Sequence, residues 1–468
     1  MQARKTDEKS ASGYKKTYPK RKNSSKVKPG HWFWISGLIG VAMVSATAGA
    51  LVAVSLSSMP LLQSRLRPDE EAMFTKGGSI STSSMQLPEL TRPVTILVLG
   101  TKVLASDLPK GQTNKPAYEL VNSFDGPSDT MLLLRFDPDT KKLTLLSIPR
   151  DTRTYIEGYG LSKINAANAK GGPALAAKTV SELLEGVGID RYVRVNVQGI
   201  QSLVDALGGV TVYVPMDMKY QDDSQHLYIN LKQGKQRLNG NKALQLLRYR
   251  YDKNGDIGRV QRQQLVMRAL MEQALNPATL ARLPKILSVI QSHIDTNLTV
   301  EELVALVGFG VQINRSNMQM LMVPGDFNGD GRKDISYWLP DNRRIQQMMA
   351  KYFDQGSGNT RDVDPAYLRV AIQDSTGKSA AVQSLITRLR EAGYQNVSLD
   401  DTWREPLRVS RIVAQQGDGS SAAAIRSRLG FGEVRVESTG SLMSDVTIQV
   451  GQDWLQKQAA SENRFFKF

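Results

Sequence analysis

The sequence has no cysteine and only three histidines, His31, His226 and His293, which lie far apart in the chain. The lack of cysteine excludes disulfides, thiolate catalysis and cysteine-ligated zinc. Histidines this few and this scattered argue against a histidine-based metal site and against a Ser-His-Asp hydrolase. Any catalysis must therefore depend on carboxylates, arginines, lysines and backbone groups.

The overall composition is that of a globular protein long enough for two ordinary domains. The chain has 468 residues, of which 41% are hydrophobic and 22% are charged. Its formal net charge of +15 indicates anionic partners, which could be nucleic acid, phospholipid or a phosphorylated substrate. The distribution of the charge decides between these classes.

The basic residues gather at the amino terminus, just before a long apolar run. Residues 1–30 hold ten Lys or Arg against Asp7 and Glu8, whereas residues 31–60 hold no charged side chain. A membrane-spanning helix needs about 20 apolar residues, and the apolar core of a signal peptide is about 7 to 15. We therefore predict a single-pass cell-membrane protein with a cytoplasmic basic tail, a transmembrane helix at 31–60 and an extracytoplasmic body. This reading disfavours nucleic acid as a partner.

After the apolar run the chain divides into two units joined by polar linkers. Residues 61–92 mix Ser, Gly, Pro and charge without periodicity, as in a tether. Strands alternating with helices over 93–352 predict a layered α/β domain. Residues 353–365 read as a second linker, and strand–helix pairs over 366–455 predict a small α/β domain.

One stretch places charges at the edge of a buried sheet. Thr130–Phe136 and Leu143–Ile148 flank a short Pro/Asp turn and predict a β-hairpin. Neither run alternates cleanly, which indicates strands covered on both faces. Because the strands of a hairpin are antiparallel, the residues just outside it meet at one rim. These residues are Asp129 on one side and Arg150, Asp151 and Arg153 on the other.

A second set of arginines is expected around a helix start. Leu238–Arg250 predicts a helix that ends in Arg248 and Arg250, and a long helix follows after Gly255 and Gly258. Arg259, Arg262 and Gln263 are expected in the first turn of that long helix. A helix N-terminus favours anions, and added arginines strengthen the effect. The alternative is that these arginines are ordinary surface residues.

Five segments in order along the chain resemble the LytR-CpsA-Psr (LCP) family of cell-wall proteins. They are ILVLG at 96–100, SDTMLLLRFDPDTKKLTLLSIPRDT at 128–152, KINAANAKGGP at 163–173, VDALGGVTVYVP at 204–215 and GDIGRVQRQQ at 255–264. Residues 366–455 are similar, more loosely, to the LytR-type C-terminal domain that many members carry.

The resemblance implies a magnesium-dependent phosphotransferase that moves a glycopolymer from a polyprenyl pyrophosphate carrier to peptidoglycan or another envelope acceptor, with pyrophosphatase as a side activity. The implied fold is an α/β domain with a central mixed sheet and an apolar lipid tunnel, preceded by one transmembrane helix and followed by a small α/β domain. Metal and arginines would neutralise a pyrophosphate leaving group without Cys or His.

The resemblance also implies roles for individual residues, carried over by position. Asp129 resembles the metal ligand. The implied catalytic residues are Asp129, Arg150, Asp151 and Asp256. The implied pyrophosphate-binding residues are Arg150, Arg153, Lys163, Arg248, Arg250, Arg259, Arg262 and Gln263. Magnesium typically takes one or two carboxylates and fills its shell with water and phosphate oxygens.

Two positions depart from the family pattern. Lys102 stands where members usually have a second metal-binding carboxylate, and Pro127 stands where many have arginine. Either Lys102 serves as a fixed positive charge near the phosphates, or Asp107 or Asp125 supplies the missing carboxylate. Two other functions stay open: a catalytically weak scaffold that binds prenyl phosphate, and a transcriptional attenuator.

Overall fold

The computed structural model describes residues 61–465, with gaps at 75–78, 82–87, 104–122, 225, 250–254, 275, 315–316, 329–335, 356–363, 401, 416 and 442. The expected basic tail and transmembrane helix, residues 1–60, lie outside this part of the chain. Among the helices that are described, none combines the length and apolar character needed to cross a membrane. The anchor therefore stays a prediction.

The first domain is built on a six-stranded sheet of order β11-β6-β1-β2-β3-β12. Neighbours β1 and β6, and β3 and β12, run parallel, whereas the other pairs run antiparallel. The strands are β1 (Val94–Thr101), β2 (Ser128–Asp137), β3 (Lys142–Ile148), β6 (Arg191–Asn196), β11 (Ile294–Thr296) and β12 (Met318–Met322). The predicted mixed central sheet is confirmed.

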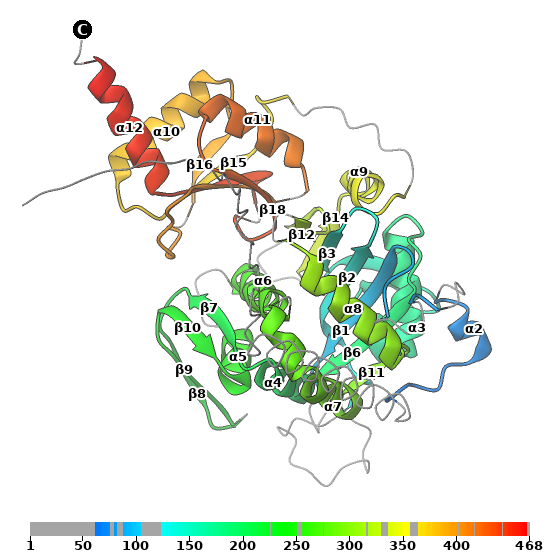
Figure 1. Cartoon of the computed structure of the whole chain (residues 1–468). Helices are drawn as coiled ribbons and strands as arrows, with labels where there is room; N and C mark the ends of the chain where they lie inside the picture. Colours follow the sequence, from blue (N-terminus) through cyan, green and yellow to red (C-terminus); the bar gives the residue numbers. More distant parts are fainter. Residues whose placement is uncertain are drawn as a thin grey trace, which may run out of the picture. The chain divides into compact units, whose positions relative to one another are not determined.

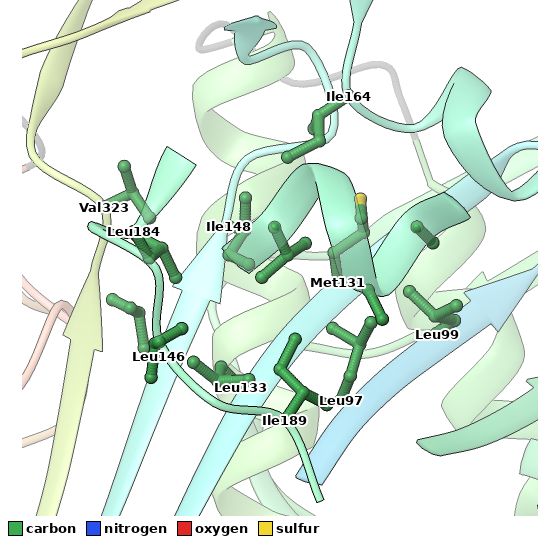
Figure 2. Close-up of a cluster of buried hydrophobic side chains, with 14 of the residues drawn as sticks. Leu97, Leu99, Met131, Leu133, Leu146, Ile148, Ile164, Leu184, Ile189 and Val323 are labelled. Carbon is green, nitrogen blue, oxygen red and sulfur yellow. The ribbon is translucent and has the colours of Figure 1, made fainter. Parts of the chain in front are cut away.

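Helices cover both faces of this sheet, which explains why its strands do not alternate in polarity. On one face α3 (Ala166–Leu183) and α9 (Asn342–Tyr352) pack on the side chains in Figure 2, which include Leu97, Leu133 and Leu146. On the other face α6 (Gly255–Ala274) and α8 (Val300–Gln312) pack against the intervening positions, Ile96, Leu132 and Leu145 among them (Figure 1). The result is a three-layer α/β/α arrangement.

The predicted hairpin is confirmed, with β2 and β3 paired from Met131–Ile148 to Asp137–Lys142. Helix α3 is interrupted at Gly171 and Gly172, whose backbone angles are not helical. Gly172 has φ 64° inside α3, a backbone conformation that favours glycine because a side chain would clash there.

The start of the long helix differs from the prediction. Helix α6 already begins at Gly255, so Arg262 lies two turns inside it and not in its first turn. The glycines did not mark the boundary because glycine costs a helix only about 1 kcal/mol, which tertiary packing overcomes. The helix-terminus argument for anion binding therefore does not extend to Arg262.

Part of the segment that was expected to be a tether is packed on the first domain. Phe74 is buried among the side chains of the first core, and Leu66 and Met73 pack against it. The short helix α2 (Pro68–Glu71) lies between them in the sequence. Leu62 forms an isolated parallel bridge with Asp295. Apolar side chains thus fix residues 66–74 to the fold, and a backbone bridge holds Leu62.

The remaining elements of the first domain surround the ends of the sheet (Figure 1). A subdomain core joins β7, β9 and β10 to α4, α5 and α6. The bounds are β4 (Arg153–Ile156), β5 (Gly160–Lys163), α4 (Val197–Ala206), β7 (Val210–Val214), β8 (Met218–Asp222), β9 (Leu227–Leu231), β10 (Gly234–Leu238), α5 (Gly240–Arg248), η2 (Pro277–Arg282), α7 (Leu283–His293), β13 (Gly325–Asn328) and β14 (Tyr337–Pro340).

The second domain has its own five-stranded sheet of order β16-β15-β19-β17-β18 and its own core around Ile372, Ile448 and Trp454. Its elements are β15 (Val370–Asp374), α10 (Ser379–Glu391), β16 (Val397–Leu399), β17 (Arg411–Ala414), α11 (Gly419–Leu429), β18 (Glu433–Val436), β19 (Val446–Val450) and α12 (Gln452–Phe465). The strand–helix pairs that the sequence predicts are present as β15–α10 and β17–α11, and a third pair, β19–α12, completes the domain with β19 at the centre of the sheet.

Candidate functional site

Asp129 occupies a β-bulge at the end of the central sheet. Along β1 and β2 the register runs in single steps until Gly100 faces Thr130, and then Thr101 faces Ser128. Asp129 is therefore the extra residue on its strand. A bulge leaves one residue unpaired and turns its side chain away from the regular alternation, and such bulges are common beside active sites.

Four charged side chains alternate in sign from this bulge outward. The Arg150 Nη1 donates to Asp129 Oδ1 at 2.5 Å, and its Nε donates to Asp151 Oδ2 at 3.4 Å. Lys163 Nζ donates to the other Asp151 oxygen at 2.7 Å. The side chain of Asp151 is only 10% exposed, whereas those of Asp129 and Lys163 are about one third exposed. Asp151 is thus an inner carboxylate that orients two cations, and Asp129 is the carboxylate that faces solvent.

Backbone hydrogen bonds hold the segments of this site together. The Ser128 N–H donates to the Asn165 carbonyl at 3.1 Å, and the Asn165 N–H donates to the Arg150 carbonyl at 3.3 Å. The Trp338 N–H donates to the Asp151 carbonyl at 3.0 Å. The turn that carries Arg150 and Asp151 is therefore tied to β2, to the start of α3 and to β14, so both side chains are aimed by fixed backbone.

The site opens onto an apolar pocket between the sheet and α6. Asp129, Arg150 and Gln263 stand at its polar end, and Leu132, Leu145, Met267 and Met320 line its apolar part. The Gln263 Nε2 donates to the backbone carbonyl of Asp129 at 3.3 Å. The free volume is about 30 Å³, room for about two water molecules. A larger apolar ligand would have to displace side chains, and methionine is the residue best suited to move.

Arg153 and Lys163 face each other across the β4–β5 hairpin. The ring of Tyr337 lies 5.8 Å from the Arg153 guanidinium and 5.6 Å from Lys163 Nζ. Two like charges directly opposite on paired strands repel, and an aromatic face offsets part of that repulsion. The structure brings Lys163 into the charged cluster and leaves Arg153 exposed at its outer edge.

The second arginine set is only partly described. Arg248 lies in the last turn of α5 and is half-buried. Arg250 lies outside the described residues, as do the side chains of Asp256 and Arg259. Whether these residues reach the cluster around Asp129 stays a prediction.

Arg262 faces the protein interior and not the pocket mouth. It is 2% exposed, and its Nη2 donates to the Tyr249 carbonyl at 2.6 Å. Burial lowers the pKa of Arg262 to about 10, so it is still charged at neutral pH. Because Tyr249 follows Arg248 directly, Arg262 can fix the end of α5. This contact supports a positioning role in place of direct phosphate binding.

Among the described residues of the charged cluster, Asp129 is the accessible carboxylate that could hold the expected magnesium. Within the described ranges, no group of three or more His, Asp or Glu side chains could hold a metal ion. Asp129 is solvent-facing, whereas Asp151 is held by Arg150 and Lys163. The side chain of Asp125 is 81% exposed and pairs with Arg194 at 3.7 Å. One carboxylate fits magnesium when phosphate oxygens and water complete the shell. Asp107 lies outside the described residues.

Two residues of the site gave no functional signal in the sequence. Tyr337 lies about 180 positions after Arg153 and Lys163, the cations that its ring contacts, so only the fold brings them together. Asn165 acts through its backbone, which carries no residue-type signal at all. The sequence indicates only that Asn165 lies just before a helix, which is α3.

The sheet, the bulged aspartate and the arginine-bearing turn define a mixed α/β protein with a cluster of charged side chains at the mouth of an apolar pocket. Residues 66–354 match the model of the LytR_cpsA_psr family. The chain belongs to this family. Residues 367–454 match a second model, described as LytR cell envelope-related transcriptional attenuator.

Curated relatives agree with this assignment. The polyisoprenyl-teichoic acid–peptidoglycan teichoic acid transferase TagU of Bacillus cereus is 32% identical over 317 residues, covering 66% of this chain and 92% of TagU. TagV of Bacillus subtilis, with the same activity in its name, is 30% identical over 306 residues, which is 64% of this chain and 74% of TagV. The regulatory protein MsrR of Staphylococcus aureus is 37% identical over 173 residues, which is 36% of this chain and 51% of MsrR.

A solved structure is also similar. The crystal structure of B. subtilis TagV aligns with a TM-score of 0.47 and 29% identity, covering 57% of this chain and 99% of that chain.

Proposed function

We propose that this protein transfers a glycopolymer from a polyprenyl pyrophosphate carrier to peptidoglycan or another envelope acceptor. The single observation that carries the proposal is the row Asp129, Arg150, Asp151 and Lys163 at the mouth of an apolar pocket. A lipid-linked pyrophosphate has the same two parts, an anionic head and an apolar tail. The activities named for TagU and TagV support the same reaction class.

In the proposed reaction an acceptor hydroxyl oxygen bonds to the phosphorus that carries the polymer. The bond from this phosphorus to the bridging oxygen breaks, and prenyl phosphate leaves with the bonding electron pair. Arg150 balances the charge that grows on the leaving oxygens, and Lys163 adds a second cation nearby. Bound magnesium at Asp129 would supply further charge neutralisation at the phosphates.

Asp129 can change partner during this reaction. Without substrate its carboxylate accepts from Arg150. An arriving pyrophosphate competes for the same guanidinium and leaves Asp129 able to accept the proton of the acceptor hydroxyl or to hold the metal. Meanwhile Asp151 Oδ2, which accepts a hydrogen bond from Arg150 Nε, keeps the guanidinium in place.

The apolar part of the pocket would receive the prenyl chain. Met267 of α6 and Met320 of β12 line this part together with Leu132 and Leu145, and the four side chains belong to one apolar cluster. The pocket is nearly filled in this conformation, so α6 side chains must move as the chain enters. Binding a flexible lipid in this way suits methionine, which has three rotatable bonds and no branch.

The proposed location is the outer face of the cell membrane. The charge-free run 31–60 and the basic tail 1–30 support an anchor with a cytoplasmic N-terminus. Since the chain has no cysteine, Ser10→Cys and Ser398→Cys would each add a single labelling site. We expect a membrane-impermeant maleimide to label the second in intact cells and not the first. Labelling of Ser10→Cys alone would place the body in the cytoplasm and end the transferase proposal.

The direct test uses the full chain in lipid vesicles with a polyprenyl pyrophosphate-linked glycopolymer and peptidoglycan. We expect polymer to become attached to peptidoglycan and prenyl phosphate to be released in equal amounts, and both to be lost in Asp129→Ala. Tight donor binding without transfer, with or without magnesium, would identify a scaffold instead.

A further inference from the structure

Arg194 is a buried arginine that joins three segments far apart in the sequence. It lies on β6 and is 3% exposed. Its Nε donates to Asp295 Oδ2 at 2.5 Å, its Nη2 to Ser64 Oγ at 2.5 Å and its Nη1 to the Phe124 carbonyl at 3.4 Å. A planar guanidinium with donors in a fixed fork can hold three partners in one geometry, which lysine cannot do.

The first of these segments directly follows the run proposed to cross the membrane. The Ser64 N–H donates to Asp295 Oδ1 at 2.6 Å, and its Oγ lies 3.1 Å from Asp295 Oδ2. The Thr296 N–H donates to the Leu62 carbonyl at 2.9 Å. Residues 62–64 thus lie beside the edge strand β11, held by one isolated parallel bridge and by hydrogen bonds to Asp295 and Arg194.

The second segment leads into the active-site bulge. Asn168 of α3, 2% exposed, donates from Nδ2 to the carbonyls of Phe124 and Gly126 at 2.9 and 2.7 Å. Arg194 Nη1 donates to the Asn168 Oδ1 at 3.4 Å, and its guanidinium lies 5.4 Å from the Phe124 ring. Both ends of the Asn168 amide are therefore used, and residues 124–126 are held only three residues before Asp129.

We propose that Arg194 is a positioning residue that couples the docking of residues 62–64 to the geometry of Asp129. Ser64 on one side and the Phe124 carbonyl on the other supply hydrogen-bond acceptors to the buried Arg194 guanidinium. If residues 62–64 leave the sheet, the Nη2 group loses its acceptor in a dry environment, and the guanidinium relaxes away from Phe124. Order in the segment next to the membrane then favours order in the loop before Asp129, and the coupling is reciprocal. The catalytic part of this inference rests on the proposed transfer activity.

The test compares Arg194→Lys with a matched control on the same strand. Arg191 pairs with Glu302, a side chain 1% exposed, at 2.6 Å, so Arg191→Lys disturbs a buried ion pair of the same kind elsewhere in the domain. The Arg194→Lys side chain keeps a charge opposite Asp295 but cannot donate to Ser64 and Phe124 together. Ser64→Ala removes the remote contact alone.

The measurements use the full chain in vesicles. By hydrogen exchange, we expect Arg194→Lys to speed exchange of residues 62–66 and 123–130 about tenfold. Ser64→Ala should also speed exchange at 123–130, and this effect should vanish when Arg194→Lys is already present. In the transfer assay, we expect kcat to fall about tenfold with the donor KM within about twofold, because a small displacement of a catalytic group lowers the rate more than the binding.

Three results would overturn the coupling. Ser64→Ala could leave exchange at 123–130 unchanged, or its effect could persist in the Arg194→Lys background. Alternatively, Arg191→Lys could lower kcat as much as Arg194→Lys at an equal loss of unfolding temperature, which would make Arg194 a purely structural residue. A parent chain without transfer activity would refute the proposed function, whereas the exchange experiment would still decide the coupling.

Discussion

Arg150 and Asp129 are 21 residues apart in the sequence, and their side chains meet at 2.5 Å beyond the paired ends of β2 and β3. The contact joins the residue in the bulge to the turn after the hairpin. Neither side chain has a packing reason to be there, since both remain partly exposed. By pairing with Arg150 in the absence of substrate, Asp129 would keep the guanidinium directed at the pocket mouth. An incoming phosphate could then replace the carboxylate as the partner of Arg150.

Arg150→Lys should therefore lower transfer by about a hundredfold, because lysine is a point charge that cannot hold two phosphate oxygens in a fork. The matched control is Arg135→Lys, at the other end of β2, where the side chain pairs with Asp354. We expect the control to keep its activity within about twofold and both variants to keep a parent-like circular dichroism spectrum. An unfolded Arg150→Lys protein would instead make this arginine a structural residue.

Chelation should test the metal and the identity of its ligand. We expect EDTA to abolish transfer and added magnesium to restore it, and Lys102→Asp to reduce the magnesium needed for half-maximal rate, because a second carboxylate raises affinity for a hard cation. Asp129→Asn should require more magnesium than the parent. Asp125→Asn is the control, and a larger effect there than at Asp129 would move the metal site to the loop.

Met267→Trp should prevent entry of the prenyl chain by filling the pocket between α6 and β12. We expect the KM for a long-chain donor to rise at least about tenfold, while a short, water-soluble pyrophosphate analogue is bound as before. Met267→Leu is the volume-conserving control, for which we expect a cost below about 1.5 kcal/mol in stability and little change in KM. Equal effects of Met267→Trp on both donors would place the lipid elsewhere.

Glu302→Ala should destabilise the first domain by about 3 kcal/mol, the low end of the range for a buried pair, because it leaves the half-buried Arg191 without its carboxylate. Glu302 is 1% exposed, pairs with Arg191 at 2.6 Å and closes a capping box with Thr299 at the start of α8. Its neighbour Glu301 lies in the same turn, and Glu301→Ala should cost less than about 1 kcal/mol. Thermal unfolding followed by circular dichroism would measure both, and equal losses would contradict the role given to Glu302.

The hairpin and its rim could be predicted from the sequence because the information is local. The runs around the Pro/Asp turn fix the pairing of β2 with β3, and pairing alone brings Asp129 to Arg150. The second domain was predictable for the same reason, since β15, β17 and β19 are each followed closely by a helix.

The orientation of Arg262 could not be predicted in this way. A row of arginines on one helix face has the same spacing whether that face meets solvent or Tyr249, and only tertiary packing decides. The same holds for residues 62–74, whose polar composition hides the few side chains, Phe74 among them, that pack on the core. The sequence pattern does not indicate which distant segments contact each other.

The bulge at Asp129 has a consequence for how this protein could change over evolution. Met131 and Leu133 on the same strand are buried, and their register with β1 runs in single steps beyond the bulge. A substitution at position 129 therefore leaves the strand's other side chains on their own faces. A single substitution at position 129 could therefore change the proposed catalytic function while the fold of the first domain stays the same.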